Sequence, residues 1–421
     1  MKKRRKRKSN KKILIFGSII IICILTITTV LMLTNKPLLN KKDNILPDII
    51  NHYNKTVITN KVSKIYIKNN DEYKEIGTIE DSVILTLKDE EITENTRYFI
   101  VSNMDEEYYI KYNDVEKSES EYQKIERYKR YIPFNENIYG NNIKLYRDDK
   151  LIYTLNKEVS LPIYIKDNDT YYVEYANELF KVKKEEVEIV TNNNTSEKNT
   201  KGVGVLNYHF FWDDQTEKRS ECNQEICHST TQFKEHLDYI KNNNIFTPTM
   251  SELEMYIDGK IQLPRSVVIT IDDGWRADIG IKILNEYELN ATLFLITGDY
   301  NPDDFKSEYV ELHSHTDRLH AAGKCPGGQG GGIKCLPKDE ILNDLKTSRE
   351  KLNNSTVLCY PFYEYNSYSI EVAKEAGFTM AFRGESYNSD NLVKVGSDKF
   401  RLPRFVVVTY TTMSDFTKYI G

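Results

Sequence analysis

The stretch that decides the fold of this chain is Val267-Val268-Ile269-Thr270-Ile271-Asp272-Asp273-Gly274. Its first five residues are apolar or β-branched, and this pattern predicts a buried strand. The strand ends in two adjacent carboxylates and a glycine. Two neighbouring like charges are costly unless something positive lies beside them. The alternative is an ordinary turn, because Asp and Gly both favour turn geometry.

Two imidazoles follow about forty residues later, in His315-Thr316-Asp317-Arg318-Leu319-His320. One aspartate and two histidines make a three-ligand set for a divalent metal and leave a position open for water. The second aspartate is then free to act as a base. The two motifs together predict a metal site more strongly than either does alone.

Residues 202–421 alternate between strand and helix patterns. Two capping boxes are expected, Ser229 with Gln232 and Ser251 with Glu254, and the second helix ends at Gly259. We expect one helix between the strand at 267–271 and Tyr287, and two more over 339–352 and 369–376. Strands are expected over 203–209, 267–271, 291–296, 309–312, 357–360 and 405–408.

This alternation predicts parallel strands in an α/β fold, as a distorted (β/α) barrel. In such barrels the chemistry lies at the carboxyl ends of the strands. His209, Asp272, Asp273 and His315 all fall at predicted strand ends, and His320 falls in the loop just beyond. Agreement between such distant segments favours one shared site.

The N-terminus predicts a membrane anchor. Residues 1–12 include nine Lys or Arg and no acid, and residues 13–34 carry no charge. A helix of about 20 apolar residues spans a bilayer, and the basic flank stays in the cytoplasm. A cleaved signal peptide is the alternative, but its apolar core is usually shorter. We expect a single-pass protein of the cell membrane, with a stalk at 35–60 and an extracellular catalytic domain.

Residues 61–190 are rich in Tyr, Ile and Val in short alternating runs, which predicts strands. The stretch 105–112 is echoed by 169–175, so we expect two tandem β modules, over 61–120 and 121–190. They resemble bacterial SH3-like wall-associated modules; a single irregular β domain is the alternative. Residues 191–201 are polar and form a linker.

The net charge limits the possible partners of the chain, and the cysteines indicate the redox environment of its exterior part. The chain has a net charge of −5, and its exterior part is more acidic still once the basic tail is set aside. This argues against nucleic acid as a partner. Four cysteines come in close pairs, Cys222 with Cys227 and Cys325 with Cys335. Outside the membrane they favour disulfides, although three connectivities are open.

The two metal-site motifs resemble those of the polysaccharide deacetylases with a NodB-homology domain, carbohydrate esterase family 4. The long spacing between the histidines, and the Tyr-His strand end at His209, are similar to the poly-N-acetylglucosamine deacetylase branch used in biofilm matrix. The resemblance covers residues 202–421. It departs from the family at the third motif, where Pro361-Phe362-Tyr363 replaces the usual Pro-Tyr-Gly and the preceding Arg is missing.

The resemblance implies a role for each matching residue. Asp273, His315 and His320 would bind the metal, usually zinc. Asp272 would take a proton from water and His209 would protonate the leaving amine. Arg404, or else Arg401, would orient Asp272 in place of the missing Arg.

Further residues are candidates for the walls of the site. Backbone N–H groups near Phe362 and Tyr363 would hold the oxyanion, Tyr363 could stack on a sugar ring, and Trp275 could flank the groove. We also expect the glycine-rich loop between Cys325 and Cys335 to form one wall.

The expected activity is metal-dependent removal of N-acetyl groups from N-acetylglucosamine units of an extracellular polysaccharide. The branch likeness favours a poly-N-acetylglucosamine-type exopolysaccharide. Peptidoglycan is the alternative, since the β modules predict contact with the cell wall. A non-catalytic wall-binding protein, supported by the missing Arg, and a glycosidase, which would leave the histidines without a role, are further alternatives.

Overall fold

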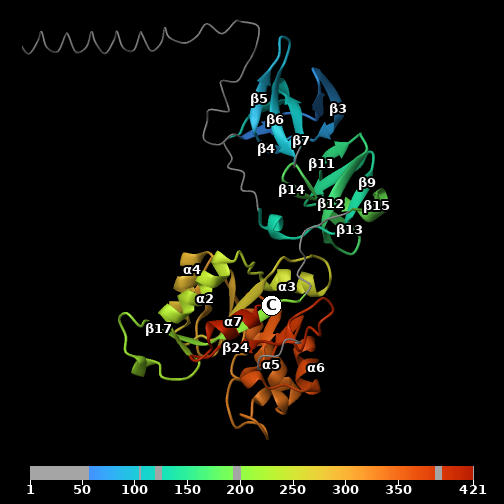
Figure 1. Cartoon of the computed structure of the whole chain (residues 1–421). Coiled ribbons are helices and arrows are strands. Elements are labelled where there is room, and N and C mark those ends of the chain that lie inside the picture. The colour runs from blue at the N-terminus through green and yellow to red at the C-terminus, as the bar shows by residue number, and fades with distance from the viewer. Residues whose placement is uncertain (1–55, 104–105, 119–125, 193–200, 385–390, 421) are drawn as a thin grey trace, which may run out of the picture.

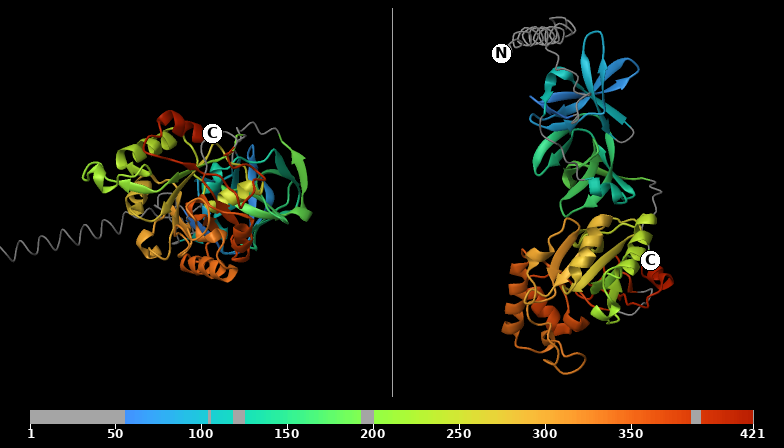
Figure 2. Two further views of the ribbon diagram at one scale, coloured as in Figure 1. Left: turned by 90° about the horizontal axis from the view of Figure 1, so that it is seen from below. Right: turned by 90° about the vertical axis from the view of Figure 1, so that its left-hand side faces the viewer.

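The computed structural model describes residues 56–103, 106–118, 126–192, 201–384 and 391–420. A β-rich part (56–192) and an α/β part (201–420) follow one another along the chain. Figures 1 and 2 show the strands of the β-rich part stacked on one side of the α/β part. The predicted tail and membrane span, and most of the stalk, lie outside the described residues. Within the described ranges, no helix has the length and apolar content to cross a bilayer.

The β-rich part forms two sheets. A three-stranded sheet has the order β4-β1-β8, and a twelve-stranded sheet has the order β15-β9-β12-β13-β14-β10-β11-β3-β2-β7-β6-β5. The strands of the first half are β1 (Thr56–Thr59), β2 (Ser63–Asn69), β3 (Glu72–Ile79), β4 (Ile84–Thr86), β5 (Asp89–Ile92), β6 (Arg97–Asn103), β7 (Glu106–Lys111) and β8 (Val115–Lys117). Those of the second half are β9 (Glu136–Gly140), β10 (Ile143–Arg147), β11 (Lys150–Leu155), β12 (Val159–Lys166), β13 (Thr170–Tyr175), β14 (Glu178–Lys183) and β15 (Glu188–Thr191).

The two halves are joined more closely than separate modules need be. Strand β11 pairs with β3, with Tyr153 opposite Ile79 and Leu155 opposite Gly77. One apolar cluster runs through both halves, from Val57 to Val182. Tandem SH3-like modules stay a prediction, and these contacts link the halves into one packed region.

The internal repeat is present, but it is offset by one strand from the sequence echo. In the first half β7 leads into a 3-10 turn, η1 (Tyr112–Asp114), and then Val115. In the second half it is β14 that leads into the matching turn, η3 (Lys184–Glu186), and then Val187. The echo at 169–175 lies on β13, one strand earlier, because the tyrosines of this hairpin are on β13 and β14 has none.

The α/β part is built on a seven-stranded parallel sheet with the order β23-β22-β21-β20-β19-β16-β24. Its strands are β16 (Gly204–Tyr208), β19 (Val267–Asp273), β20 (Ala291–Leu295), β21 (Val310–Ser314), β22 (Val357–Cys359), β23 (Met380–Phe382) and β24 (Phe405–Val406). Its helices are α2 (Thr230–Asn242), α3 (Met250–Ile257), α4 (Ala277–Tyr287), α5 (Lys338–Lys351), α6 (Ser367–Glu375) and α7 (Met413–Tyr419). A short pair, β17 (Phe210–Trp212) with β18 (Cys227–Ser229), lies beside the main sheet.

The sheet curves into an incomplete barrel. Its edge strands β23 and β24 do not pair with each other along their length, but Phe382 makes a parallel bridge to Leu402, just before β24. The side chains of β16 and most of β19 are buried, as expected for parallel strands that are covered on both faces. The predicted parallel α/β architecture is therefore present, in the form of a half-barrel.

Helix caps follow the sequence in one case and differ in another. Ser229 accepts a hydrogen bond from the backbone of Gln232 and starts α2, so the predicted N-cap is present. The capping box is not completed, because the Gln232 side chain contacts His228 and the carbonyl oxygen of Thr409 instead. The second prediction is wrong, because α3 starts two residues early and its capping box is Thr249 with Glu252. Thr249 and Ser251 both stand three residues before a glutamate, so the pattern alone does not choose between them.

The β-rich and α/β parts meet at a defined joint. Arg127 donates to both carboxylate oxygens of the buried Glu252, at 2.5 Å each, and Tyr131 donates to the same carboxylate at 2.6 Å. Tyr128 and Tyr131 also belong to an apolar cluster that includes Leu253. Both polar and apolar contacts therefore hold the two parts together.

Candidate metal and catalytic site

Parallel pairing brings the predicted site residues to one edge of the sheet. Tyr208 of β16 lies opposite Ile271 of β19, so His209 and Asp272 follow next to each other. Leu295 of β20 pairs with Asp273 on one side and with Ser314 of β21 on the other. The carboxyl ends of parallel strands share an edge, and the site residues of three strands gather there.

Asp273, His315 and His320 form a compact cluster. One ligand atom from each lies within 4.8 Å of the others. Oδ1 of Asp273 is 3.4 Å from Nε2 of His315 and 3.5 Å from Nε2 of His320. This oxygen is buried and has no hydrogen-bond partner in the described part of the chain. A carboxylate oxygen facing two imidazole nitrogens suits a divalent metal such as zinc.

The orientation of His315 is fixed from behind. Its Nδ1 lies 2.9 Å from the carbonyl oxygen of Cys359. A carbonyl only accepts, so Nδ1 carries the proton and Nε2 presents its lone pair to the cluster. Metal-binding histidines are commonly oriented in this way. This feature supports the metal-site interpretation independently of the spacing.

The loop between the two histidines is held by a residue that the motifs did not single out. Asp344 of α5 accepts hydrogen bonds from the backbone N–H groups of Asp317 and Arg318, at 2.9 and 2.6 Å. Burial, together with the charge of Asp317, raises the pKa of Asp344 to about 6, although the N–H groups oppose this shift. No local sequence pattern identifies this contact, because Asp344 comes from a distant helix.

Asp272 is paired with Arg404. Nη1 of Arg404 lies 2.6 Å from Oδ1 and Nη2 lies 2.8 Å from Oδ2, and both side chains are fully buried. Burial alone would raise the pKa of Asp272, but the charge of Arg404 and its hydrogen bonds hold this pKa well below its ordinary value. Asp272 is therefore an anion at neutral pH. The alternative partner, Arg401, pairs instead with Asp398.

A buried thiol lies beside this pair and was not predicted to be near it. Nη2 of Arg404 lies 2.9 Å from Sγ of Cys359, and this sulfur is 3.5 Å from Oδ2 of Asp272. The sequence placed Cys359 on a buried strand. The pairing of β21 with β22, at the single position Ser314–Leu358, brings it to the site.

His209 also lies close to Asp272. Its Nε2 is 4.0 Å from Oδ2 of Asp272 and 3.2 Å from the hydroxyl of Tyr363. Burial lowers the pKa of His209, although the carboxylates of Asp272 and Asp273 oppose this. The candidate acid therefore faces the candidate base across a short gap.

The third-motif residues Phe362 and Tyr363 contact two histidines of the site. The Phe362 ring packs on His320, with ring centroids 4.3 Å apart. Tyr363 is partly buried, and its hydroxyl turns toward His209. Trp275 is 38% exposed and packs edge-on against Phe210, at 4.9 Å. Trp275 is thus solvent-accessible, and its place beside a substrate groove stays a prediction.

Both candidate cysteine pairs are disulfides in the structure. Cys222 is joined to Cys227, and Cys325 to Cys335. The glycine-rich loop closed by the second bridge is tied to Glu364, which accepts from the backbone N–H groups of Gln329 and Gly331. Glu364 follows the third motif directly, so the loop is anchored beside the site.

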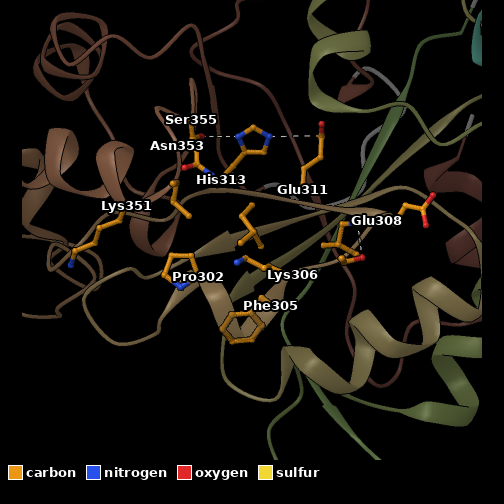
Figure 3. A pocket seen from close by; sticks show the side chains of 13 residues that line it. Pro302, Phe305, Lys306, Glu308, Glu311, His313, Lys351, Asn353 and Ser355 are labelled. Carbon is orange, nitrogen blue, oxygen red and sulfur yellow. Dashed lines mark hydrogen bonds and ion pairs between the residues drawn. The ribbon is translucent and has the colours of Figure 1, made fainter. Parts of the chain in front are cut away.

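His313 precedes His315 by two residues and does not join the metal cluster. Its Nδ1 bonds Oγ of Ser355 at 2.7 Å, and its Nε2 is 3.8 Å from Oε2 of Glu311. Figure 3 shows these three residues at a hollow of about 790 Å³, which is also lined by Pro302 and Phe305. His313 is therefore engaged away from the candidate site.

Comparison with known proteins identifies the domain. The family model for polysaccharide deacetylase matches residues 259–381. YxkH of Bacillus subtilis (strain 168), which is named for a proposed polysaccharide deacetylase activity, is 23% identical over 168 residues. These residues are 37% of this chain and 57% of that protein. The chain therefore contains a polysaccharide deacetylase domain, which agrees with the family that the two motifs resemble.

Solved structures show a similar fold. A de-N-acetylase from Aggregatibacter actinomycetemcomitans is 21% identical, with 52% of this chain and 99% of that chain covered and a TM-score of 0.44. IcaB from Ammonifex degensii is 19% identical, with 52% and 95% covered and a TM-score of 0.42. The segment matched by the family model includes the metal cluster and Asp272. His209 and Arg404 lie outside it, so the structure is what relates these two residues to the cluster.

Proposed function

We propose that this protein removes N-acetyl groups from N-acetylglucosamine units of an extracellular polysaccharide in a metal-dependent reaction. The observation that carries the proposal is the juxtaposition of the Asp273–His315–His320 cluster with the Asp272–Arg404 pair and with His209. A glycosidase pairs a carboxylate with a second carboxyl group whose pKa is raised so that it can act as the acid. Here the pKa values of both Asp272 and its neighbour Asp273 are lowered, so this pair does not supply that acid.

Each residue has a role that its surroundings support. Asp273, His315 and His320 would hold the metal, which when bound supplies an acidified water and polarises the acetamide carbonyl. Asp272 is held as an anion by Arg404 and would serve as the general base toward that water. His209 lies 4.0 Å from Asp272 and protonates the departing amine. The backbone N–H of Phe362 is a candidate for holding the oxyanion. The backbone N–H of Tyr363, predicted for the same role, donates instead to the carbonyl oxygen of Tyr360 at 3.0 Å.

Arg404 bears on the question of activity. The Arg that precedes the third motif in the family is missing here, and this loss was the support for a non-catalytic protein. Arg404 contacts both oxygens of Asp272 from a different segment. The base therefore has a cationic partner in place of the missing Arg, at the position the sequence analysis preferred, and this supports catalysis.

The polymer and the cellular setting are part of the proposal. The likeness to the poly-N-acetylglucosamine branch favours an exopolysaccharide of the biofilm matrix, and peptidoglycan is the alternative. We propose that residues 13–34 anchor the chain in the cell membrane with the catalytic domain outside. The β-rich part would then contact the cell wall or hold the catalytic domain away from the bilayer.

Acetate release by the full chain in detergent tests this function. The substrates are β-1,6-linked poly-N-acetylglucosamine, a chitin oligomer and peptidoglycan glycan strands, each with and without added zinc. We expect zinc-dependent release, fastest from the β-1,6-linked polymer, and a loss of about 10²- to 10⁴-fold in Asp272→Asn, in keeping with loss of a general base. If the metal-loaded wild type releases no acetate from any of the three, the proposal is wrong.

A further inference from the structure

Tyr363 occupies a position where the resemblance expects glycine, and its side chain reaches into the acid–base machinery. Its hydroxyl donates to Oδ1 of Asn207 at 2.7 Å and lies 3.2 Å from Nε2 of His209. The amide of Asn207 is itself oriented, since its Nδ2 donates to the carbonyl of Tyr208 at 3.1 Å. Oδ1 is therefore the atom that faces Tyr363, and it can only accept.

This arrangement fixes the direction of both hydrogen bonds. The single hydroxyl proton of Tyr363 is committed to Asn207, so the hydroxyl oxygen presents a lone pair to His209. Nε2 of His209 must then be the nitrogen that carries a proton. It is also the nitrogen that faces Asp272, at 4.0 Å. Nδ1 of His209 is buried and has no hydrogen-bond partner among the described residues.

The Tyr363 ring is held on both sides. The Cζ atom of Arg404 lies 5.6 Å from its centroid, a cation–π contact. On another side Gly384 lies so close that a Cβ added there would be 2.5 Å from Cγ of the ring. The ring therefore contacts the arginine that pairs with the base, while its hydroxyl contacts the acid.

The backbone adds an independent sign that this side chain is functional. Phe362 and Tyr363 have φ values of 54° and 61°, in the left-handed region. A non-glycine residue is strained there, because its Cβ comes too close to the following carbonyl oxygen. Such strain persists where other contacts over-determine the conformation, and it is concentrated at functional sites. Glycine would relieve the strain but would remove both contacts.

We infer that Tyr363 is a positioning residue that couples the acid His209 to the Arg404–Asp272 pair, through its hydroxyl on one and its ring on the other. The inference rests on the proposed function, because it assigns a partner to the proposed acid. It differs from the expected roles of Tyr363 in holding the oxyanion or stacking on sugar. The backbone N–H of Tyr363 donates to the carbonyl oxygen of Tyr360, and the hydroxyl is engaged by Asn207 and His209.

The test is Tyr363→Phe in the full chain, assayed by acetate release from the polymer that the wild type cleaves. We expect kcat to fall about 10- to 100-fold, the scale of one hydrogen bond to an ionisable group. KM and bound zinc should stay within about twofold of the wild type, on the same reasoning. The matched control is Tyr365→Phe, because that ring stacks on Tyr360 at 4.9 Å instead; its kcat should be unchanged.

A double-mutant cycle separates positioning from general loss of structure. In a His209→Gln background, Tyr363→Phe should change the residual kcat less than twofold, because the group it positions is gone. Asn207→Ala leaves the tyrosine in place but removes its acceptor, and should lower kcat in the same direction. It serves as the second variant if Tyr363→Phe does not fold.

The outcomes are distinguishable. If the wild type is active and Tyr363→Phe retains full kcat, or loses the same factor with and without His209, the coupling is refuted while the proposed function stands. If the wild type is inactive on every polymer, the function is wrong and this inference falls with it.

Discussion

Arg404 and Arg401 lie three residues apart and have opposite surroundings. Arg404 is fully buried on Asp272, whereas the side chain of Arg401 is 50% exposed beside an equally exposed Asp398. Removing one partner of a buried ion pair leaves an unpaired charge, which costs about 3–5 kcal/mol. An exposed pair contributes about 0–1 kcal/mol.

We therefore expect Arg404→Met to lower the free energy of unfolding by about 3–5 kcal/mol and to abolish acetate release. Arg401→Met should lower the free energy of unfolding by less than about 1 kcal/mol and leave activity intact. Denaturant titration and acetate assays on both variants provide the check. Equal losses in the two variants would mean that the Asp272–Arg404 pair has no special role.

His315 and His313 allow a similar comparison for the metal. They are two residues apart, but only His315 points a free nitrogen at Asp273. His315→Ala should weaken zinc binding by more than the roughly 10- to 100-fold that loss of an outer-sphere partner causes. His313→Ala should leave zinc binding unchanged. Zinc content after dialysis against a chelator measures both, and retained zinc in His315→Ala would remove this residue from the ligand set.

At this scale the metal cluster could be predicted from the sequence, and its surroundings could not. Asp273, His315 and His320 follow strand patterns whose carboxyl ends must share an edge, so their meeting follows from parallel pairing. Tyr363 contacts His209 across 154 positions in the chain, and Asp272 contacts Cys359 across 87. Such contacts depend on the curvature of the sheet, which no local pattern encodes.

At the scale of elements, α5 holds the loop that carries His320 in place through hydrogen bonds to Asp344. Asp344 accepts from two backbone N–H groups of that loop, yet burial raises its pKa to about 6, above its ordinary value of 3.8. The folded state therefore binds this proton more tightly than the unfolded state does. The corresponding stability is fully present below about pH 4 and is lost as the pH rises through about 6.

Asp344→Asn removes this titration. The free energy of unfolding of the wild type, minus that of Asp344→Asn, should fall by roughly 1–3 kcal/mol between pH 4 and pH 7. The exposed Asp339 on the same helix is the control, and Asp339→Asn should show no such trend. Urea titrations at half-unit pH intervals measure the difference; a difference that stays flat or rises would contradict the shifted pKa.

Element types were predicted better than their partners and boundaries. Strong periodicity predicts α2 and α5 because their buried side chains recur at helical spacing. Strand β23 has three residues and α7 seven, too short for a clear period. The pairing of β11 with β3 was not predicted, because an alternating strand pattern does not specify its neighbour.

At the scale of the whole molecule, the joint between the β-rich and α/β parts depends on one carboxylate. Glu252 is 6% exposed, caps α3 through the backbone of Thr249, and accepts from Arg127 and Tyr131. Lys260 and Asp167 make a second, more exposed ion pair across the same joint, at 2.8 Å. A region that only tethered the domain would not need a buried charge at this boundary.

We expect Arg127→Met to weaken the joint by about 1–3 kcal/mol, the value of hydrogen bonds to a charged group. Calorimetry should then resolve separate unfolding of the two parts, where the wild type unfolds more cooperatively. The comparison is Arg130→Met, because Arg130 lies on the same 3-10 turn, η2 (Glu126–Arg130), and is exposed. It crosses the joint only through a 3.3 Å hydrogen bond to the carbonyl oxygen of Asn244 and a contact with the Phe246 ring, so its loss should weaken the joint less than Arg127→Met does.

Activity distinguishes a joint that orients the catalytic domain from one that only stabilises it. If orientation matters, Arg127→Met should release acetate from a soluble oligosaccharide at the wild-type rate, since the metal cluster lies on the strand ends and not at the joint. On polymer attached to cells its rate should fall. The opposite outcome is a variant whose two parts unfold separately but which releases acetate from both substrates at the wild-type rates. That result would show that the β-rich part does not direct the catalytic domain toward its substrate.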